Sequence, residues 1–163
     1  MKKKFRELVK RKNRIHANLE LVQWDLETKT PLKSRPYLSE LVGELSMQDY
    51  ALSTSDEFVN LVEELNKQKE NLTEIEKREI ELSMEEIEKK KKIPADEYED
   101  YAKLTSYNQT VWEEAKAKKD FSIAKEGLKK IFDYNKKFAT YRKKDEKNLY
   151  DVLLNDYEKG MDS

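Results

Sequence analysis

Glycine and proline are scarce in this chain, and this scarcity limits the folds open to it. Each residue type occurs only three times among 163 residues. Sheet-rich folds place glycine and proline at frequent turns, so such low numbers argue against a large β-sheet. The three most frequent residues are lysine, glutamate and leucine, which are good helix formers. The sequence therefore predicts an all-α protein.

The spacing of apolar residues predicts a bundle of about six to seven helices. Apolar residues recur three or four positions apart, as a helix buried on one face requires. The predicted helices cover approximately residues 3–25, 35–52, 56–67, 73–92, 94–119, 122–141 and 150–154. The length is that of one domain, and no linker rich in glycine, proline or serine divides the chain. We therefore expect residues 1–163 to form a single helical domain.

Several residues predict where helices begin, end or meet. Thr73 and Glu76 have the spacing of a capping box, in which each side chain bonds the backbone N–H of the other residue. Ser34 is placed to cap the helix that follows it. Gly127 lies inside a predicted helix and marks a close approach of another helix, whereas Gly160 is placed to end the last helix or to shape the turn that follows it.

The charge balance excludes nucleic-acid binding by bulk charge. Lysine and arginine number 33 against 34 aspartate and glutamate, which gives a formal net charge of −1. The run 89–92 of four lysines falls in the last turn of a predicted helix, where the helix dipole favours cations. We therefore interpret it as a helix terminus and predict no nucleic-acid partner.

The aromatic residues of the chain have the spacing of a helix core. Tyr98, Tyr101, Tyr107 and Trp112 recur at helical intervals among mixed charges, so a platform for stacking nucleic-acid bases is disfavoured. We expect Trp112 and the other tryptophan, Trp24, to be partly or wholly buried.

The sequence predicts neither a membrane span nor a secretory signal. No apolar run approaches the ~20 residues that a spanning helix needs. The basic N-terminus, Met1 to Phe5, leads into a charged helix, whereas a signal peptide would continue into an apolar segment. A cytoplasmic location is the expectation that follows.

The residues offer few candidates for catalysis or metal binding. Cysteine is absent and His16 is the only histidine, which excludes a thiolate site and a site with two histidines. We interpret His16 as a structural or solvent-facing residue. Carboxylate pairs such as Glu85-Glu86 are adjacent in sequence and point in different directions on a helix, so they form no shared site. Asp25 and Glu27 lie where a helix gives way to a loop, and we assign them capping and loop hydrogen bonds.

Two segments of the sequence have a recognisable pattern: the first runs from Trp24 and Asp25 to Pro31, and the second covers 150–161. Both resemble the N-terminal region of the carboxypeptidase Taq family of zinc metallocarboxypeptidases, in which the first segment reads Trp-Asp-x-Glu-Thr-x-Met-Pro. The segment 150–161 matches Tyr-Asp-x-Leu-Leu-x-x-Tyr-Glu-Pro-Gly-Met, and Ile93-Pro94-Ala95, Leu104-Thr105-Ser106 with Trp112, and Asp120-Phe121-Ser122 follow the family order between them. Thr30 and Lys159 depart from the pattern, because the family has Met and Pro at these positions. The motif positions, to which we assign structural roles, are Trp24, Asp25, Pro31, Trp112, Tyr150, Asp151, Tyr157 and Gly160.

The resemblance implies a peptidase lineage and places the catalytic centre outside this sequence. Family members are much longer, and their zinc-binding His-Glu-x-x-His helix lies downstream of the matched region. That motif needs two histidines one helical turn apart, with a glutamate that activates the zinc-bound water. A single histidine does not meet this requirement, so we assign no catalytic residue and no metal ligand here, and expect zinc only in a full-length homologue.

Two functions remain open at this point. In the first, the chain is the N-terminal helical part of a metallocarboxypeptidase, walls the substrate cleft as part of a larger all-α fold, and is inactive alone. Peptides are then substrates only in the full-length context. In the second, the chain is a stand-alone interaction module that self-associates or docks onto a separate catalytic half, since surplus apolar surface seeks a partner. Asp162 and Ser163 resemble the N-cap of a further helix, which favours the first function.

Overall fold

Helices form the whole of the regular structure in the computed structural model, which describes residues 1–163 and contains no strand. The all-α prediction is therefore confirmed. The seven α-helices are α1 (Lys2–Thr28), α2 (Arg35–Thr54), α3 (Asp56–Lys67), α4 (Glu74–Lys91), α5 (Ala95–Lys118), α6 (Ser122–Arg142) and α7 (Leu149–Leu154), with short 3-10 helices η1 (Leu32–Ser34) and η2 (Lys69–Asn71). None of these helices is long and apolar enough to cross a membrane.

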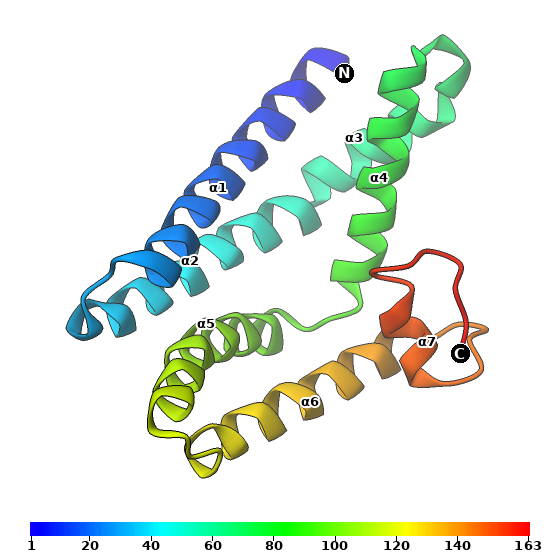
Figure 1. The fold of residues 1–163 in the computed structure, drawn as a ribbon. Helices are drawn as coiled ribbons and strands as arrows, with labels where there is room; N and C mark the ends of the chain where they lie inside the picture. Colours follow the sequence, from blue (N-terminus) through cyan, green and yellow to red (C-terminus); the bar gives the residue numbers. More distant parts are fainter. The chain divides into compact units, whose positions relative to one another are not determined.

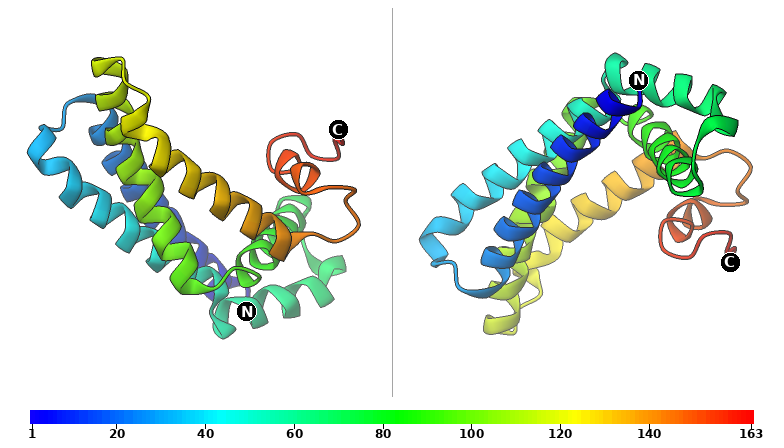
Figure 2. Two further views of the ribbon diagram at one scale, coloured as in Figure 1. Left: turned by 90° about the horizontal axis from the view of Figure 1, so that it is seen from below. Right: turned by 90° about the horizontal axis from the view of Figure 1, so that it is seen from above.

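The chain divides into two compact units, residues 1–99 and 100–163. In the first unit, α1 and α2 form an antiparallel hairpin, α3 follows α2, and α4 returns against α3 and α2 (Figure 1; Figure 2). The second unit contains most of α5 together with α6 and α7. The expected single domain over residues 1–163 stays a prediction.

Local capping explains why several helices begin where the sequence predicts. The capping box is present: the hydroxyl of Thr73 accepts the N–H of Glu76, whose carboxylate accepts the N–H of Thr73 at 3.0 Å. The Ser55 hydroxyl caps α3 by accepting the N–H of Phe58 at 3.2 Å. Each such cap stabilises a helix by about 1 kcal/mol, because it satisfies a backbone donor that the helix leaves unpaired.

Two boundary predictions around the first turn are wrong. The first helix continues past the predicted end near Asp25 to Thr28, whose hydroxyl donates to the carbonyl of Trp24 at 2.7 Å. It stops before Pro31, which restricts the residue ahead of it. Ser34 precedes α2, but its side chain makes no cap hydrogen bond, because η1 already holds this residue in a helical conformation.

The core of the first unit lies where α1, α3 and α4 meet. Its buried residues are Phe5, Phe58, Val59, Val62, Leu65, Leu72, Ile80 and Ile87. The rings of Phe5 and Phe58 stack with their centroids 6.0 Å apart. Complete burial of one such side chain stabilises the fold by about 1.5–3 kcal/mol. Within α4, the buried residues are Ile80 and Ile87.

In the second unit, α5 and α6 meet through aromatic rings and one glycine. The ring of Tyr101 lies 5.2 Å from that of Phe138, and its hydroxyl donates to Asn135 Oδ1 at 3.0 Å. A Cβ atom added to Gly127 would lie 1.9 Å from Oδ1 of the buried Asn108. The close approach predicted at Gly127 is therefore confirmed.

Candidate functional site

The first family motif forms the turn between α1 and α2. Asp25 holds this turn: its carboxylate accepts the hydroxyl of the buried Thr30 at 2.7 Å, and its carbonyl accepts the N–H groups of Lys29 and Thr30, each at 3.2 Å. Pro31 follows in an extended conformation and leads into η1. These contacts fix the path of the turn, and the structural roles assigned to Asp25 and Pro31 stay a prediction.

The tryptophan of this motif does not enter the core. Trp24 is 70% exposed, so the predicted burial is wrong. Three other large apolar residues near the same turn, Leu21, Leu32 and Tyr37, are also about 70% exposed. In the same segment the polar residues Arg35 and Ser39 are buried. This end of the hairpin thus covers polar groups and presents apolar ones.

The second family motif includes α7 and the segment after it. The side chain of Asn148 caps α7 by accepting the N–H of Asp151 at 2.9 Å. Asp151 is buried, and its Oδ1 accepts the N–H of Ser163 at 2.9 Å, whereas its buried Oδ2 has no hydrogen-bond partner. The hydrogen bond from Ser163 lowers the pKa of Asp151. Asp151 therefore anchors the last residues of the chain against α7.

The other residues of the second motif shape or border this segment. Gly160 has φ +84°, a left-handed conformation that glycine adopts without strain, and its N–H donates to Asn155 Oδ1 at 2.8 Å. Tyr150 and Tyr157 are exposed. Trp112 on α5 is 42% exposed and is thus partly covered, as expected. The motif positions lie in both compact units.

A cluster of charged side chains joins α1, α2 and α4 within the first unit. Lys12 pairs with Glu86, and Lys90 pairs with Asp49. Lys90 also bonds Glu86 at 2.6 Å, and Asp49 contacts His16 Nε2 at 2.9 Å. The hydroxyl of Ser53, which is fully buried, lies 3.4 Å from both Glu86 and Lys90. We call these six residues the ionic cluster.

The ionic cluster balances two lysines against two carboxylates in a largely buried place. The side chains of Lys12, Asp49 and Lys90 are 11%, 5% and 14% exposed. Burial alone would lower the pKa of Lys90, but its hydrogen bonds to Asp49 and Glu86 outweigh burial and raise it. For Glu86, burial would raise the pKa, and the hydrogen bonds from Lys12 and Lys90 lower it instead. Glu86 and Lys90 are thus held in their charged forms at neutral pH.

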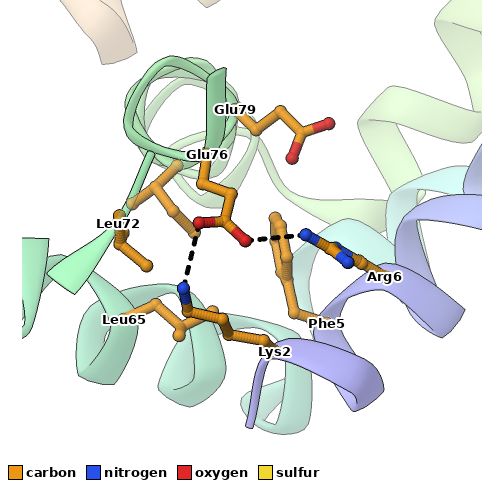
Figure 3. Close-up of a pocket in the computed structure, with 8 residues that line it drawn as sticks. Lys2, Phe5, Arg6, Leu65, Leu72, Glu76 and Glu79 are labelled. Carbon is orange, nitrogen blue, oxygen red and sulfur yellow. Dashed lines mark hydrogen bonds and ion pairs between the residues drawn. The ribbon is translucent and has the colours of Figure 1, made fainter. Parts of the chain in front are cut away.

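A second charged group borders a small pocket at the start of α1 and α4 (Figure 3). The Glu76 carboxylate accepts hydrogen bonds from Lys2 Nζ at 3.0 Å and from Arg6 Nη2 at 2.7 Å. It also accepts the backbone N–H of Thr73 in the capping box. The backbone N–H of Thr73 and the Lys2 ammonium lower the pKa of Glu76 to about 2. The pocket encloses about 10 Å³, the space of a single water molecule, so it is no ligand site.

Neither charged group fits a zinc ion. Catalytic zinc sites take three protein ligands, commonly histidines with a carboxylate. No group of three or more histidine, cysteine, aspartate or glutamate side chains in this chain is arranged to hold a metal. The single histidine, His16, is half exposed and bonds Asp49, which also pairs with Lys90, and Glu86 of the same cluster pairs with Lys12. Ammonium groups in those places repel a dication, so no metal-dependent step is derived for these residues.

The all-α fold and the order of the motif segments along the chain point to a class, the helical region of a metallopeptidase. A sequence profile of the carboxypeptidase Taq (M32) metallopeptidase family matches residues 4–163. The chain belongs to that family.

Individual relatives agree with this assignment. The chain is 36% identical over 159 residues to carboxypeptidase 1 of Bacillus subtilis, and 38% identical over 146 residues to thermostable carboxypeptidase 1 of Pyrococcus furiosus. These matches cover 98% and 90% of this chain but only 32% and 29% of the two carboxypeptidases. The chain thus spans about a third of the length of its relatives.

Solved structures show the same fold. The crystal structure of BsuCP superimposes with a TM-score of 0.94 at 36% identity, over 98% of this chain and 32% of that chain. The structure of Pyrococcus furiosus carboxypeptidase gives a TM-score of 0.73 at 34% identity, over 96% of this chain and 32% of that chain. The helical architecture described above is therefore that of part of a metallocarboxypeptidase.

Sequence reasoning missed the ionic cluster. Its members come from three helices, and Lys12 lies 74 residues from Glu86. The one local signal is the spacing of Glu86 and Lys90, four residues apart on one helix face. This finding is compatible with the prediction that Glu85 and Glu86 form no shared site, because Glu86 forms ion pairs with two lysines and not a site with Glu85.

Proposed function

We propose that this chain is the N-terminal part of a zinc-dependent metallocarboxypeptidase, in which it forms a wall of the substrate cleft. The supporting observation is the family match over residues 4–163, joined to a TM-score of 0.94 over only a third of BsuCP. The family reaction is the hydrolytic release of C-terminal amino acids from peptides. In this proposal the zinc ligands and the catalytic glutamate belong to the remaining two thirds, and this chain supplies a rigid helical scaffold.

The proposal predicts that the isolated chain does not hydrolyse peptides. Purified protein is incubated with a short peptide and with zinc or cobalt, and released amino acids are measured by mass spectrometry. We expect no release, because no set of three metal ligands is present. Metal-dependent release that grows in proportion to the chain, and that survives repeated purification, would contradict the proposal.

The size of the native polypeptide tests the same proposal in its source cells. An immunoblot with antibodies raised against this chain should detect a band about three times larger than 19.5 kDa, as the share of the relatives that it covers predicts. A band at 19.5 kDa would favour the second candidate function, a separate helical module that binds a partner.

The exposed apolar residues Leu21, Trp24, Leu32 and Tyr37 are the observation that favours this second candidate. Light scattering and binding of a hydrophobic dye distinguish the two functions. A module that self-associates through these residues forms a stable dimer that binds little dye, whereas an isolated part of a larger enzyme is a monomer that binds dye.

A further inference from the structure

At the end of the α1–α2 hairpin, large apolar side chains are exposed to solvent, whereas two polar side chains are buried. Four large apolar residues, Leu21, Trp24, Leu32 and Tyr37, are 68%, 70%, 73% and 70% exposed. Leu21 and Trp24 lie one turn apart in the last part of α1, Leu32 lies in η1, and Tyr37 lies in the first turn of α2. We call these four residues the hairpin-end surface.

The backbone under the hairpin-end surface is held in one conformation. The carboxylate of Asp25 binds the hydroxyl of Thr30, and its carbonyl binds two backbone N–H groups of the turn. Pro31 and Pro36 restrict the backbone on either side of η1. The exposed apolar side chains therefore project from a preformed turn, which lowers the entropy lost when a partner covers them.

Building on the proposed function, we propose that the hairpin-end surface is the place where the following two thirds of the carboxypeptidase pack against this chain. The relatives carry about two thirds of their length beyond the region that this chain matches. A partner in the same polypeptide is present at high effective concentration, so a small apolar surface is enough to dock it.

The size of the surface argues against a second copy as the occupant. Four side chains of this kind at about 70% exposure present on the order of 500 Å², if an aromatic side chain contributes 150–250 Å². A dimer closed by this surface alone would bury about 1,000 Å² in total, below the roughly 1,200–2,000 Å² of stable protein interfaces. The surface is thus too small for a dimer and of adequate size for one contact within a larger chain.

The charge around the surface argues against an anionic occupant. Residues 20–40 contain four acidic side chains and three basic ones. Membrane surfaces and nucleic acids attract clusters of lysine and arginine, which this segment lacks. An apolar face of the protein's own downstream helices is the occupant that remains.

A hybrid protein tests the proposal. This chain replaces the matched third of Bacillus subtilis carboxypeptidase 1, and the double variant W24S/Y37S is compared with the parent hybrid. Serine resembles tryptophan and tyrosine in helix propensity, so the isolated chain should keep its melting temperature in this variant. In the hybrid, we expect the same variant to lower the melting temperature by about 5 °C or more. The matched control, E20S/E40S, changes exposed polar residues of the same two helices and should move neither value much.

The melting temperatures of the hybrids test the docking proposal, and the activity of the parent hybrid tests the proposed function. A variant that leaves the hybrid's melting temperature unchanged overturns the docking proposal, and so does a dimer of the isolated chain that W24S/Y37S dissociates. The activity of the parent hybrid with zinc tests the proposed function separately: a folded but inactive parent contradicts that function, whatever the variant does.

A second measurement applies if the hybrid does not fold. Hydroxyl-radical oxidation is compared between the isolated chain, at residues 21–37, and the aligned segment of full-length Bacillus subtilis carboxypeptidase 1. We expect at least a tenfold slower oxidation of the side chains in the full-length relative. Equal oxidation rates would overturn the proposal, because the segment would then be as exposed beside the catalytic part as it is without it.

Discussion

The substitution Lys90→Met tests how much the ionic cluster stabilises the first unit. Lys90 bonds both Asp49 and Glu86, and its side chain is only 14% exposed. Methionine keeps the length of the side chain but removes the charge, which leaves Asp49, 5% exposed, without its lysine. Breaking a buried ion pair by removing one partner costs about 3–5 kcal/mol, because the remaining charge stays desolvated.

The structure places the expected cost at the lower end of this range. Glu86 keeps its pair with Lys12, and Asp49 keeps its contact with His16 at 2.9 Å. We therefore expect K90M to lower the free energy of unfolding by about 3 kcal/mol, or the melting temperature by about 6–12 °C in a chain of this length. The measurement is urea unfolding at pH 7, followed by circular dichroism.

Two further variants separate lost charge pairing from lost packing. Lys91→Met changes an exposed neighbour on the same helix and should move stability by less than about 0.5 kcal/mol. The double variant D49L/K90M removes the pair together and should recover most of the loss, since apolar replacement of a whole buried pair is often neutral. The reasoning is refuted if K90M resembles K91M, or if the double variant is less stable than K90M alone.

Three other predictions follow from single contacts. The pKa of Glu76 is about 2, below the ordinary value of 4.5, so the ionised carboxylate contributes fully to the stability of the fold above pH 4.5. That contribution is lost as the pH falls from 4.5 toward 2. E76Q should therefore flatten this part of a plot of the free energy of unfolding against pH. Gly127→Ala places a methyl group against Asn108 and should cost about 1 kcal/mol net of the gain in helix propensity, and N108A/G127A should restore stability in urea unfolding. Trp112→Ala should cost about 2 kcal/mol, roughly half the value for a buried tryptophan, since Trp112 is 42% exposed; an unchanged melting temperature would contradict this contact.

Local signals in the sequence predicted the helices well. The bounds of α3 agree with the predicted range, because Ser55 caps its start and the break after Lys67 precedes the capping box of α4. The close approach at Gly127 was predictable because glycine is costly inside a helix and needs a compensating contact. The end of α1 was not predictable to the residue, since Asp25 and Glu27 are polar enough for a loop and yet continue the helix to Thr28.

Tertiary contacts explain what the sequence left out. Trp24 was expected to be partly or wholly buried, yet it lies off the apolar stripe that runs through Val22 and Leu26, of which Leu26 is buried. The helical period therefore places Trp24 on another face of α1. For this residue the period predicts exposure better than the hydrophobicity of the side chain does. The ionic cluster joins residues tens of positions apart, such as His16 and Asp49, and no local pattern records such a pairing.

The distribution of charge and apolar surface in the first unit connects its stability to its proposed role. A small unit that was stable by itself would place its large apolar residues inside and its lysines in water. This unit instead buries Lys12 and Asp49, at the cost of their desolvation, and leaves Trp24 and Tyr37 exposed. Balanced charges hold α1, α2 and α4 in a defined register, and the fixed turn presents the apolar residues in a defined place. Such an arrangement makes physical sense when another part of the protein covers the hairpin end, and it explains why the W24S/Y37S variant should matter in the hybrid and not in the isolated chain.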